Sequence, residues 1–272
     1  METPKVSIIM AVYNGEEFLG SSILSVLNQS YKNFEFIIVN DGSTDGSLKI
    51  AEDFQRNDNR IKIINNAQNL GLTKSLNVGF LASKGEYIAR LDSGDISLPE
   101  RIERQVEFLD ENKNIGLVGT WMYIINTKGE ILRAIKYPTN DKAIKKALIN
   151  YNPFAHSSIM LRRSMLPRID IYDEGYRYTQ DYKLYVDLYP YTEFANLPIT
   201  LVKYRLSPNS ITSSKNKKQM SFANKARIRA IQLGYYSKWN YIYVIKYYLI
   251  SLIPTKLKFL IKKIYENTLF NN

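Results

Sequence analysis

The chain has 272 residues, 45% hydrophobic and 12% aromatic, a composition that can bury a large core and excludes a mainly disordered protein. It contains no cysteine and one histidine, which excludes disulfide frameworks, thiolate zinc sites, cysteine nucleophiles and multi-histidine metal cages, and makes a reducing, cytoplasmic location the expectation. Its formal net charge of +11 favours an anionic partner.

The first part of the chain alternates between strand-like and helix-like patterns. Short apolar runs predict buried strands at residues 6–12, 34–39, 61–64 and 87–91. Apolar residues at helical spacing predict helices between them, at residues 16–28, 45–54 and 72–82. This order predicts an α/β fold with a mostly parallel sheet flanked by helices, in which ligands bind beyond the carboxyl ends of the strands.

Two more elements are predicted further along the chain. Ser97, which is followed by Pro99, is expected to cap a helix that runs to about residue 112, and residues 116–125 predict another strand. The loops after the predicted strands are the candidate site. They are Tyr13–Gly15, Asn40–Asp45 and Asp92–Asp95.

These loops are polar and acidic. Carboxylates there can accept hydrogen bonds from a base or ribose, or hold a divalent cation that bridges two phosphates. Each loop alone is more often a turn followed by a helix N-cap. A dinucleotide-binding enzyme is disfavoured, because no glycine-rich turn follows the first strand.

Five segments, in their order and spacing, resemble the family 2 glycosyltransferases of the GT-A fold. They are VSIIMAVYNGEEFL, SVLNQSYKNFEFIIVNDGSTDGS, NLGLTKSLNVGF, KGEYIARLDSGDISLPERI and TQDYKLYVDL, within residues 4–212. The resemblance implies a GT-A (Rossmann-like) fold and an enzyme that transfers a sugar, with inversion, from a nucleotide diphosphate donor to an acceptor hydroxyl.

The resemblance also implies roles for particular residues. Asp181 matches the catalytic base that takes the proton from the acceptor hydroxyl, although Gln180 stands where the family usually has Glu. Asp41 matches the acceptor of a nucleobase N–H, and His156 falls near the donor sugar and the acceptor. Trp121 could stack on an acceptor sugar or pack in the core. The residues expected to contact the nucleotide-sugar donor are Ala11, Tyr13, Asn14, Asp41, Lys74, Asp92, Ser93, His156 and Arg205.

The metal-binding motif of the family differs in this chain. Its usual form, Asp-X-Asp-Asp, reads here Asp92-Ser93-Gly94-Asp95, and Ser207 stands where many relatives have a His near the diphosphate. Mn²⁺ or Mg²⁺ could still bind through Asp92, Asp95 and the donor phosphates. Alternatively, basic side chains could neutralise the leaving diphosphate, namely those of Lys74, Lys203 and Arg205. We therefore expect a weakened dependence on divalent metal.

The C-terminal part differs in character from the rest. We expect a GT-A domain at residues 1–212, with a donor half at 1–115 and an acceptor and catalytic-base half at 116–212, followed by a basic, aromatic-rich helical tail at 213–272. Residues 215–272 hold twelve Lys/Arg and one acidic residue, so this tail carries the excess positive charge.

The tail contains two apolar segments. Residues 239–253 are almost wholly apolar or aromatic, but they include Lys246 and are too few to span a bilayer. After Pro254, apolar residues recur at helical spacing with lysines on the other side, a pattern typical of a helix lying in a membrane interface. These apolar residues are Leu257, Leu260, Ile261, Ile264 and Tyr265. The tail could instead pack on the body, or bind nucleic acid, for which no recognised reader motif is present.

The sequence therefore predicts a cytoplasmic, peripherally membrane-associated glycosyltransferase of the hexosyl- or N-acetylhexosaminyltransferase class. Its expected substrates are a UDP-sugar and a lipid-linked glycan acceptor in capsule, O-antigen or exopolysaccharide assembly, and its tail is expected to contact the inner membrane surface. No nucleic acid partner is expected. The alternative is a catalytically degenerate sugar-nucleotide-binding or scaffolding protein, which Gly94, Gln180 and Ser207 suggest.

Overall fold

The computed structural model describes residues 3–167, 171–206 and 216–253. The chain divides into two compact units, Met1–Ser210 and Ile211–Asn272. The roles assigned above to residues 1–115, 116–212 and 213–272 stay predictions.

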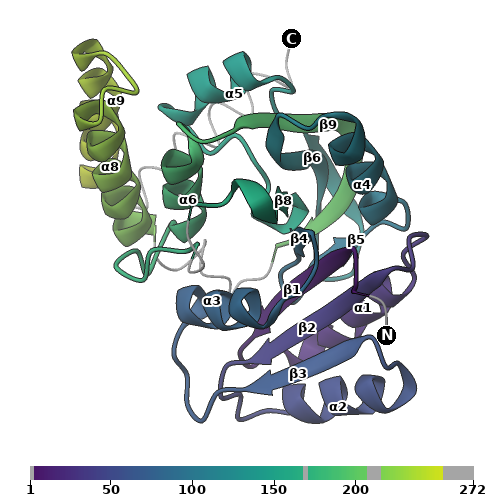
Figure 1. Cartoon of the computed structure of the whole chain (residues 1–272). Coiled ribbons are helices and arrows are strands. Elements are labelled where there is room, and N and C mark those ends of the chain that lie inside the picture. The colour runs from purple at the N-terminus through teal and green to yellow at the C-terminus, as the bar shows by residue number, and fades with distance from the viewer. Residues whose placement is uncertain (1–2, 168–170, 207–215, 254–272) are drawn as a thin grey trace. The chain divides into compact units, whose positions relative to one another are not determined.

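The N-terminal half of the first unit is a parallel sheet with helices on both faces (Figure 1). Its strands pair in the order β3-β2-β1-β4, and they are β1 (Val6–Val12), β2 (Phe34–Asn40), β3 (Ile61–Asn65) and β4 (Tyr87–Arg90). The helices between them are α1 (Glu16–Leu27), α2 (Ser47–Asn57) and α3 (Leu72–Ala82). Because side chains alternate along a strand, Ile8 and Met10 join the core cluster that includes Leu19 of α1, whereas Ile9 lies against Gly79 of α3.

The sheet continues beyond β4 in the order β8-β6-β9-β5, with β7 paired to β6. These strands are β5 (Ile96–Ser97), β6 (Ile115–Ile125), β7 (Ile131–Ile135), β8 (Met160–Arg162) and β9 (Glu193–Arg205). The helices are α4 (Arg101–Glu111), α5 (Asp141–Leu148) and α6 (Gln180–Leu188). The predicted α/β fold is confirmed. Among the described strands of this half, however, only β6 and β9 pair in parallel, since short connections such as that between β6 and β7 allow antiparallel neighbours.

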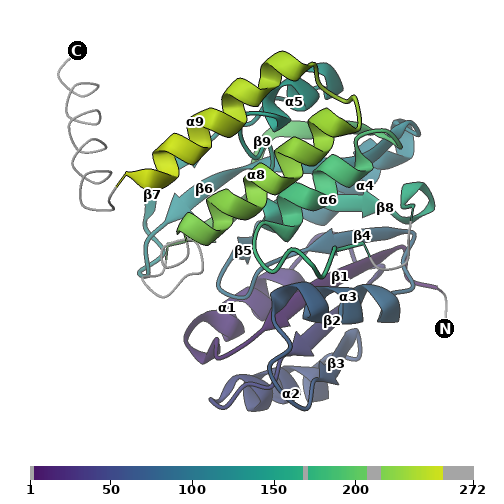
Figure 2. The same ribbon diagram turned by 90° about the vertical axis from the view of Figure 1, so that its left-hand side faces the viewer.

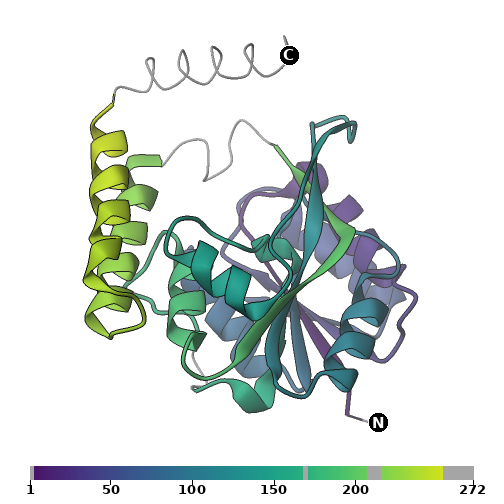
Figure 3. The same ribbon diagram turned by 90° about the horizontal axis from the view of Figure 1, so that it is seen from above.

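The two longest strands, β6 and β9, lie side by side and are bent; they are the long teal and green strands in Figure 3. Their register shifts on both sides of Trp121, and such bulges bend a strand and redirect its side chains. At the same level Thr120 donates its N–H to the hydroxyl of Ser158, at 3.0 Å, in the 3-10 helix η1 (His156–Ser158). The bend therefore brings β6 against the segment that carries His156.

One local prediction is wrong. Ser97 does not cap a helix, because it lies in β5, is buried and pairs with Val202 of β9. Helix α4 begins only at Arg101, after Pro99 and Glu100. Pairing with a strand more than 100 residues away overrides the local capping pattern. Short-range reasoning from the sequence cannot detect such a pairing.

The described part of the second unit is a pair of helices, α8 (Asn216–Gln232) and α9 (Tyr241–Leu252), which lie side by side in Figure 2. Gly234, at φ 79°, ends the first helix in the left-handed conformation that favours glycine. Asn224 donates a hydrogen bond to the carbonyl of Val244, at 3.1 Å, and the Arg227 guanidinium lies 4.1 Å from the centre of the Tyr247 ring. None of the helices in the described ranges combines the length and apolar character that crossing a membrane requires. The predicted helix after Pro254 lies outside the described residues.

Candidate active site

The loop after β1 is joined to the loop after β2. Asn14, at φ 49°, accepts a hydrogen bond from the N–H of Thr44 at 2.8 Å, and its own N–H donates to the hydroxyl of Ser43 at 3.1 Å. The neighbouring Tyr13 is 51% exposed, so its ring is open to a planar ligand. Ala11 lies in β1, two residues before this open ring.

Asp41, directly after β2, is almost fully buried. Its Oδ1 accepts hydrogen bonds from the Asn66 side chain and the Leu70 N–H, both at 2.8 Å, and its Oδ2 accepts one from the Gly71 N–H at 2.9 Å. Burial alone would raise the pKa of Asp41, but these hydrogen bonds outweigh it and lower the pKa, so the carboxylate stays ionised. Asp41 therefore holds the segment that leads into α3 through its hydrogen bonds.

The loop after β4 forms a tight turn. The N–H of Asp95 donates to the carbonyl of Asp92 at 3.1 Å, and Gly94, the third residue, has φ 108°, as the third position of a type II turn requires. Gly94 donates its N–H to the hydroxyl of Ser22 at 2.9 Å. A Cβ atom on Gly15 would lie 2.8 Å from Oγ of Ser93, so the loops after β1 and β4 lie against each other.

Arg90, the last residue of β4, holds the loop Asp92–Asp95, called the acidic loop below, in place. Both terminal nitrogens of its guanidinium donate to the carboxylate of Asp92, and one also donates to Oγ of Ser157 at 3.1 Å. The Ser157 hydroxyl contacts Asp92 at 3.1 Å and also donates to Asp95. The Arg90 side chain is 4% exposed and that of Asp92 is 34% exposed, so a buried cation pairs with a partly exposed carboxylate.

Asp95 is buried and ties the acidic loop to the end of β9. It accepts the Ser157 hydroxyl and the backbone N–H of Arg205, the latter at 2.9 Å. Burial raises the pKa of Asp95 to about 6, against the opposing effect of these hydrogen bonds and of two nearby guanidinium groups. The Arg205 side chain lies on the same loop, donating to the carbonyl of Gly94 at 3.0 Å with its guanidinium 4.5 Å from the centre of the Phe18 ring.

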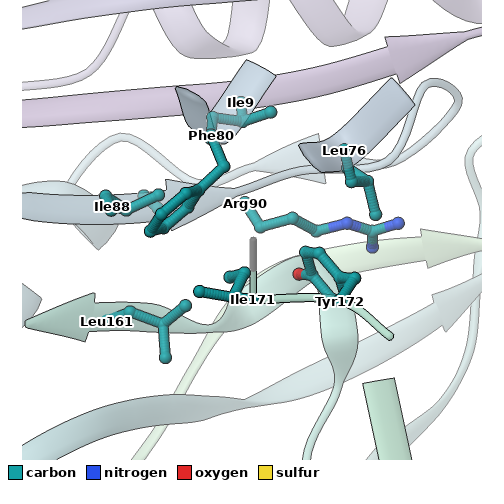
Figure 4. A pocket seen from close by; sticks show the side chains of 9 residues that line it. Ile9, Leu76, Phe80, Ile88, Arg90, Leu161, Ile171 and Tyr172 are labelled. Atoms are coloured by element: carbon teal, nitrogen blue, oxygen red, sulfur yellow. The ribbon is translucent and has the colours of Figure 1, made fainter. Parts of the chain in front are cut away.

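A small, mostly apolar cavity lies along the Arg90 side chain (Figure 4). Figure 4 shows the Arg90 side chain running along it toward Leu76 and Tyr172, with the guanidinium at that end. The lining residues are Ile9, Leu76, Phe80, Ile88, Ala89, Arg90, Leu161, Ile171 and Tyr172. Because nearly all of these side chains are apolar, the cavity is a gap in the core below the site and does not suit a charged nucleotide.

Asp181 lies in the first turn of α6. Thr179, two residues before Asp181, has φ 59°. This backbone conformation is uncommon for a β-branched residue and is often found at functional sites. Asp181 accepts a hydrogen bond from the Asn152 side chain at 2.7 Å. Burial raises its pKa, while the backbone N–H of Tyr182, the charge of Arg90 and the Asn152 amide act in the opposite direction.

His156 lies next to Tyr172, with its Nε2 atom 2.8 Å from the tyrosine hydroxyl. Burial lowers the pKa of His156 well below its ordinary value, and the charge of Arg90 adds to this, so the ring is neutral at pH 7. The backbone of Tyr172 is held on α3, since its N–H and its carbonyl both bond to the Asn77 side chain, at 3.0 and 2.8 Å.

The remaining predicted residues lie away from these contacts. Lys74 on α3 is half-exposed, with its ammonium 3.8 Å from the carboxylate of Glu174. Lys203 lies in β9 opposite Ile96. Trp121 is half-buried, donates its ring N–H to the carbonyl of Tyr137 at 3.0 Å and has the Lys136 ammonium 5.1 Å from its ring centre. Ser207 lies outside the described residues.

Residues 7–169 match the family described as Glycosyl transferase family 2. The chain belongs to glycosyltransferase family 2. A relative from Haemophilus influenzae, named an uncharacterized glycosyltransferase, is 38% identical over 243 residues, covering 86% of this chain and 74% of the relative. The O-antigen biosynthesis glycosyltransferase WbnJ from Escherichia coli is 35% identical over 214 residues, covering 77% and 82%. The protein is accordingly a glycosyltransferase.

Two solved glycosyltransferases share the fold. S. aureus TarS 1-349 in complex with UDP-GlcNAc superimposes with a TM-score of 0.69 at 21% identity, covering 84% of this chain and 66% of that one. The mannosyltransferase PcManGT from Pyrobaculum calidifontis, in complex with GDP-Man and Mn²⁺, gives 0.66 at 12% identity, covering 99% and 81%. The predicted GT-A fold is confirmed, and this glycosyltransferase spans about two thirds of the TarS chain.

The acidic loop of this glycosyltransferase does not fit a divalent cation well. Asp92 is neutralised by the Arg90 guanidinium, Gly94 supplies no carboxylate, and Asp95 is buried against Ser157 and the Arg205 N–H. Among the described residues, no group of three or more acidic or histidine side chains is placed to hold a metal ion. A cation here would have to compete with a guanidinium for Asp92.

Several residues that build the site were missed by the sequence reasoning. Arg90, Ser157, Asn152 and Tyr172 supply the contacts of Asp92, Asp95, Asp181 and His156. One signal was present for Arg90, since it is a charged residue at the end of an otherwise apolar strand, where burial demands a partner. The other three carry no local signal.

Proposed function

We propose that this glycosyltransferase transfers a sugar, with inversion, from a UDP-sugar to a hydroxyl of a lipid-linked glycan in polysaccharide assembly. The observation that supports the proposal most is the buried Arg90 guanidinium, which pairs with Asp92 and shares Ser157 with Asp95, and whose charge also acts on Asp181. The name of WbnJ supports polysaccharide assembly, and the UDP and UDP-GlcNAc complexes of TarS support the donor class. The nine residues that the sequence analysis names as donor contacts are also part of this proposal.

The proposed reaction needs one base. Asp181 takes the proton of the acceptor hydroxyl while the acceptor oxygen forms a bond to the anomeric carbon, and the bond from that carbon to the diphosphate breaks with its electron pair on the phosphate oxygen. A pKa raised by burial makes Asp181 a stronger base than an ordinary aspartate, provided that it is ionised. The Arg205 guanidinium donates to the carbonyls of Gly94, Asn126 and Thr127, and its remaining N–H groups stabilise charge on the leaving diphosphate in this proposal.

Donor hydrolysis tests the proposal directly. Purified full-length protein is incubated with a panel of UDP- and GDP-sugars, and release of the nucleotide diphosphate is measured. We expect slow release from a UDP-sugar, because water can replace the acceptor at Asp181. Thermal stabilisation by UDP-sugars without any product, with or without glycan acceptors, would contradict the proposal and favour the binding or scaffolding alternative.

A weakened metal dependence is part of the proposal, because Arg90 already neutralises Asp92 and Gly94 adds no ligand. We expect transfer to persist in excess EDTA, and added Mn²⁺ or Mg²⁺ to raise its rate by less than about tenfold, whereas metal acting as a Lewis acid supplies several kcal/mol. The measurement is the initial rate against metal concentration. A steep, saturable Mn²⁺ requirement that chelation abolishes would contradict this expectation.

We further propose that the second unit binds anionic lipid, which would hold the protein at the inner membrane surface near a lipid-linked acceptor. One face of α9 carries exposed apolar side chains at helical spacing, and Trp239 just before it is 89% exposed. The exposed side chains of this face include Ile242, Ile245, Tyr248, Leu249 and Leu252. Residues 215–272 hold twelve basic residues and one acidic residue, so anionic headgroups complement this unit in charge.

Vesicle co-sedimentation tests this membrane proposal. Deletion from Asn216 onward should abolish binding to phosphatidylglycerol-containing vesicles, and I245E/L249E should weaken it at least about tenfold, because each side chain loses its apolar burial. The matched control L24E/L81E places the same charges on exposed apolar residues of α1 and α3. Equal binding by wild type, I245E/L249E and the folded truncation would refute the proposal.

A further inference from the structure

The two carboxylate oxygens of Asp181 are not equivalent. Oδ2 accepts a hydrogen bond from the side-chain nitrogen of Asn152 at 2.7 Å. Within the described residues, no other side chain donates to this carboxylate, so Oδ1 has no side-chain partner. The backbone N–H groups of Asp181 and Tyr182 also act on this carboxylate. Because an ionised carboxylate offers about four lone-pair positions, it can still accept one further proton donor.

The orientation of the Asn152 amide is fixed by its surroundings. Its Oδ1 accepts the backbone N–H of Phe154 at 3.1 Å, so the NH₂ group must face Asp181. The same segment is anchored by the buried Asn196 of β9, which donates to the carbonyl of Pro153 at 3.1 Å and to that of Pro138 at 2.7 Å. Asn152 therefore presents a donor to Asp181 from a rigid support.

We propose that Asn152 is a positioning residue for sugar transfer, which holds Oδ2 of Asp181 so that Oδ1 faces the acceptor hydroxyl and takes its proton. This inference rests on the proposed role of Asp181 as the base. It differs from that role in assigning a second residue, on another segment, that acts only through Asp181.

Asn152 also favours the ionised form of Asp181. The other charged or titratable groups that act on Asp181 are Arg90 of β4, Tyr137 before α5, Tyr172 before α6 and Tyr185 within α6. Of these, only the Arg90 charge opposes the rise in pKa that burial of Asp181 causes. Since a hydrogen bond to a charged group is worth more than one between neutral groups, removing the Asn152 donor should raise the pKa of Asp181 by about one to two units.

The first experiment needs no substrate. The carboxyl carbons of aspartate are ¹³C-labelled in the full-length protein, the Asp181 resonance is assigned with D181N, and its titration is followed by NMR. We expect N152A to raise the pKa of Asp181 by about one to two units and N152D to raise it further, because a second carboxylate would then face the first. Y151F, in the same segment and without contact to Asp181, should leave the pKa unchanged. An unchanged pKa in folded N152A and N152D would overturn the inference.

The second experiment measures turnover of the UDP-sugar that the hydrolysis panel identifies. In N152A the acid limb of the kcat profile should move to higher pH by the same one to two units, with the Kd for UDP unchanged. A merely structural role predicts instead a loss that is the same at every pH. If the NMR shift is found and D181N is nevertheless fully active, the contact stands and the proposed base is wrong. If D181N is inactive and the profile of N152A does not move, the base stands and the role of Asn152 is wrong.

Discussion

Asp181→Asn should lower the rate of sugar transfer by about 10²- to 10⁴-fold, the effect expected for loss of a positioned general base. The amide has nearly the shape of the carboxylate and still accepts the Asn152 hydrogen bond, but it cannot take up a proton at pH 7. UDP binding should remain almost unchanged, because Asp181 acts on the acceptor. Initial rates with saturating donor and calorimetric titration with UDP measure the two effects separately.

The matched control is Asp187→Asn on the same helix, where the carboxylate pairs with the Lys183 ammonium at 2.5 Å and has no role in the proposed chemistry. It should retain most of the turnover. Near-normal turnover in D181N would show that another group takes the acceptor proton.

The pH dependence of turnover should report the same carboxylate. Because burial raises the pKa of Asp181 above 3.8, and because only the ionised form accepts a proton, the rate should fall as the pH falls through this raised pKa and level off above it. A rate that rises as the pH falls over this range would contradict the assignment of Asp181 as the base.

Arg90→Met should destabilise the first unit by about 3 kcal/mol, since removing one partner leaves the other charges of a buried cluster uncompensated. This loss is at the low end of the range that is usual for breaking a buried ion pair, because Asp92 is 34% exposed and can regain water. Asp95 is buried and cannot regain water, so a substantial loss remains. For a unit of this size the loss corresponds to a fall in Tm of roughly 6–12 °C. Thermal unfolding by circular dichroism measures it.

Arg56→Met is the matched control for this variant. Arg56 pairs with Asp53 on the exposed side of α2, where an ion pair contributes little. Its Tm should change by no more than about 2 °C. A fall of the same small size in R90M would mean that the guanidinium of Arg90 is not the cation that balances the acidic loop.

The positions of the candidate site residues were predictable where residue type and strand order suffice. Asp41 and Asp92 were expected after different strands whose loops meet at one edge of the sheet, and β2 and β4, which lie on either side of β1, place them there. The motif match extended this to Asp181, which is in the first turn of α6. The hydrogen-bond partners of each carboxylate could not be predicted. Asp41, for example, accepts hydrogen bonds from three N–H donors in residues 66–71.

The fold shows the same division. Helix α3 begins and ends at the predicted residues, whereas α2 begins at Ser47 rather than residue 45, because Asp45 instead accepts hydrogen bonds from the N–H groups of Glu16 and Ser47. Strands β5 and β8 are too short to leave a periodic pattern, and they form because longer neighbours pair with them.

By itself, the sequence determined the alternation of strands and helices and the acidic residues that end the strands, because hydrophobic periodicity specifies each element and parallel strands bring their carboxyl ends to one edge. Only the tertiary structure decided the partners of those acids. Ser157 joins Asp92 from 65 residues away, and the Arg205 N–H reaches Asp95 across 110 residues. Such contacts depend on how the sheet curls, and burial then sets the charge state of each group.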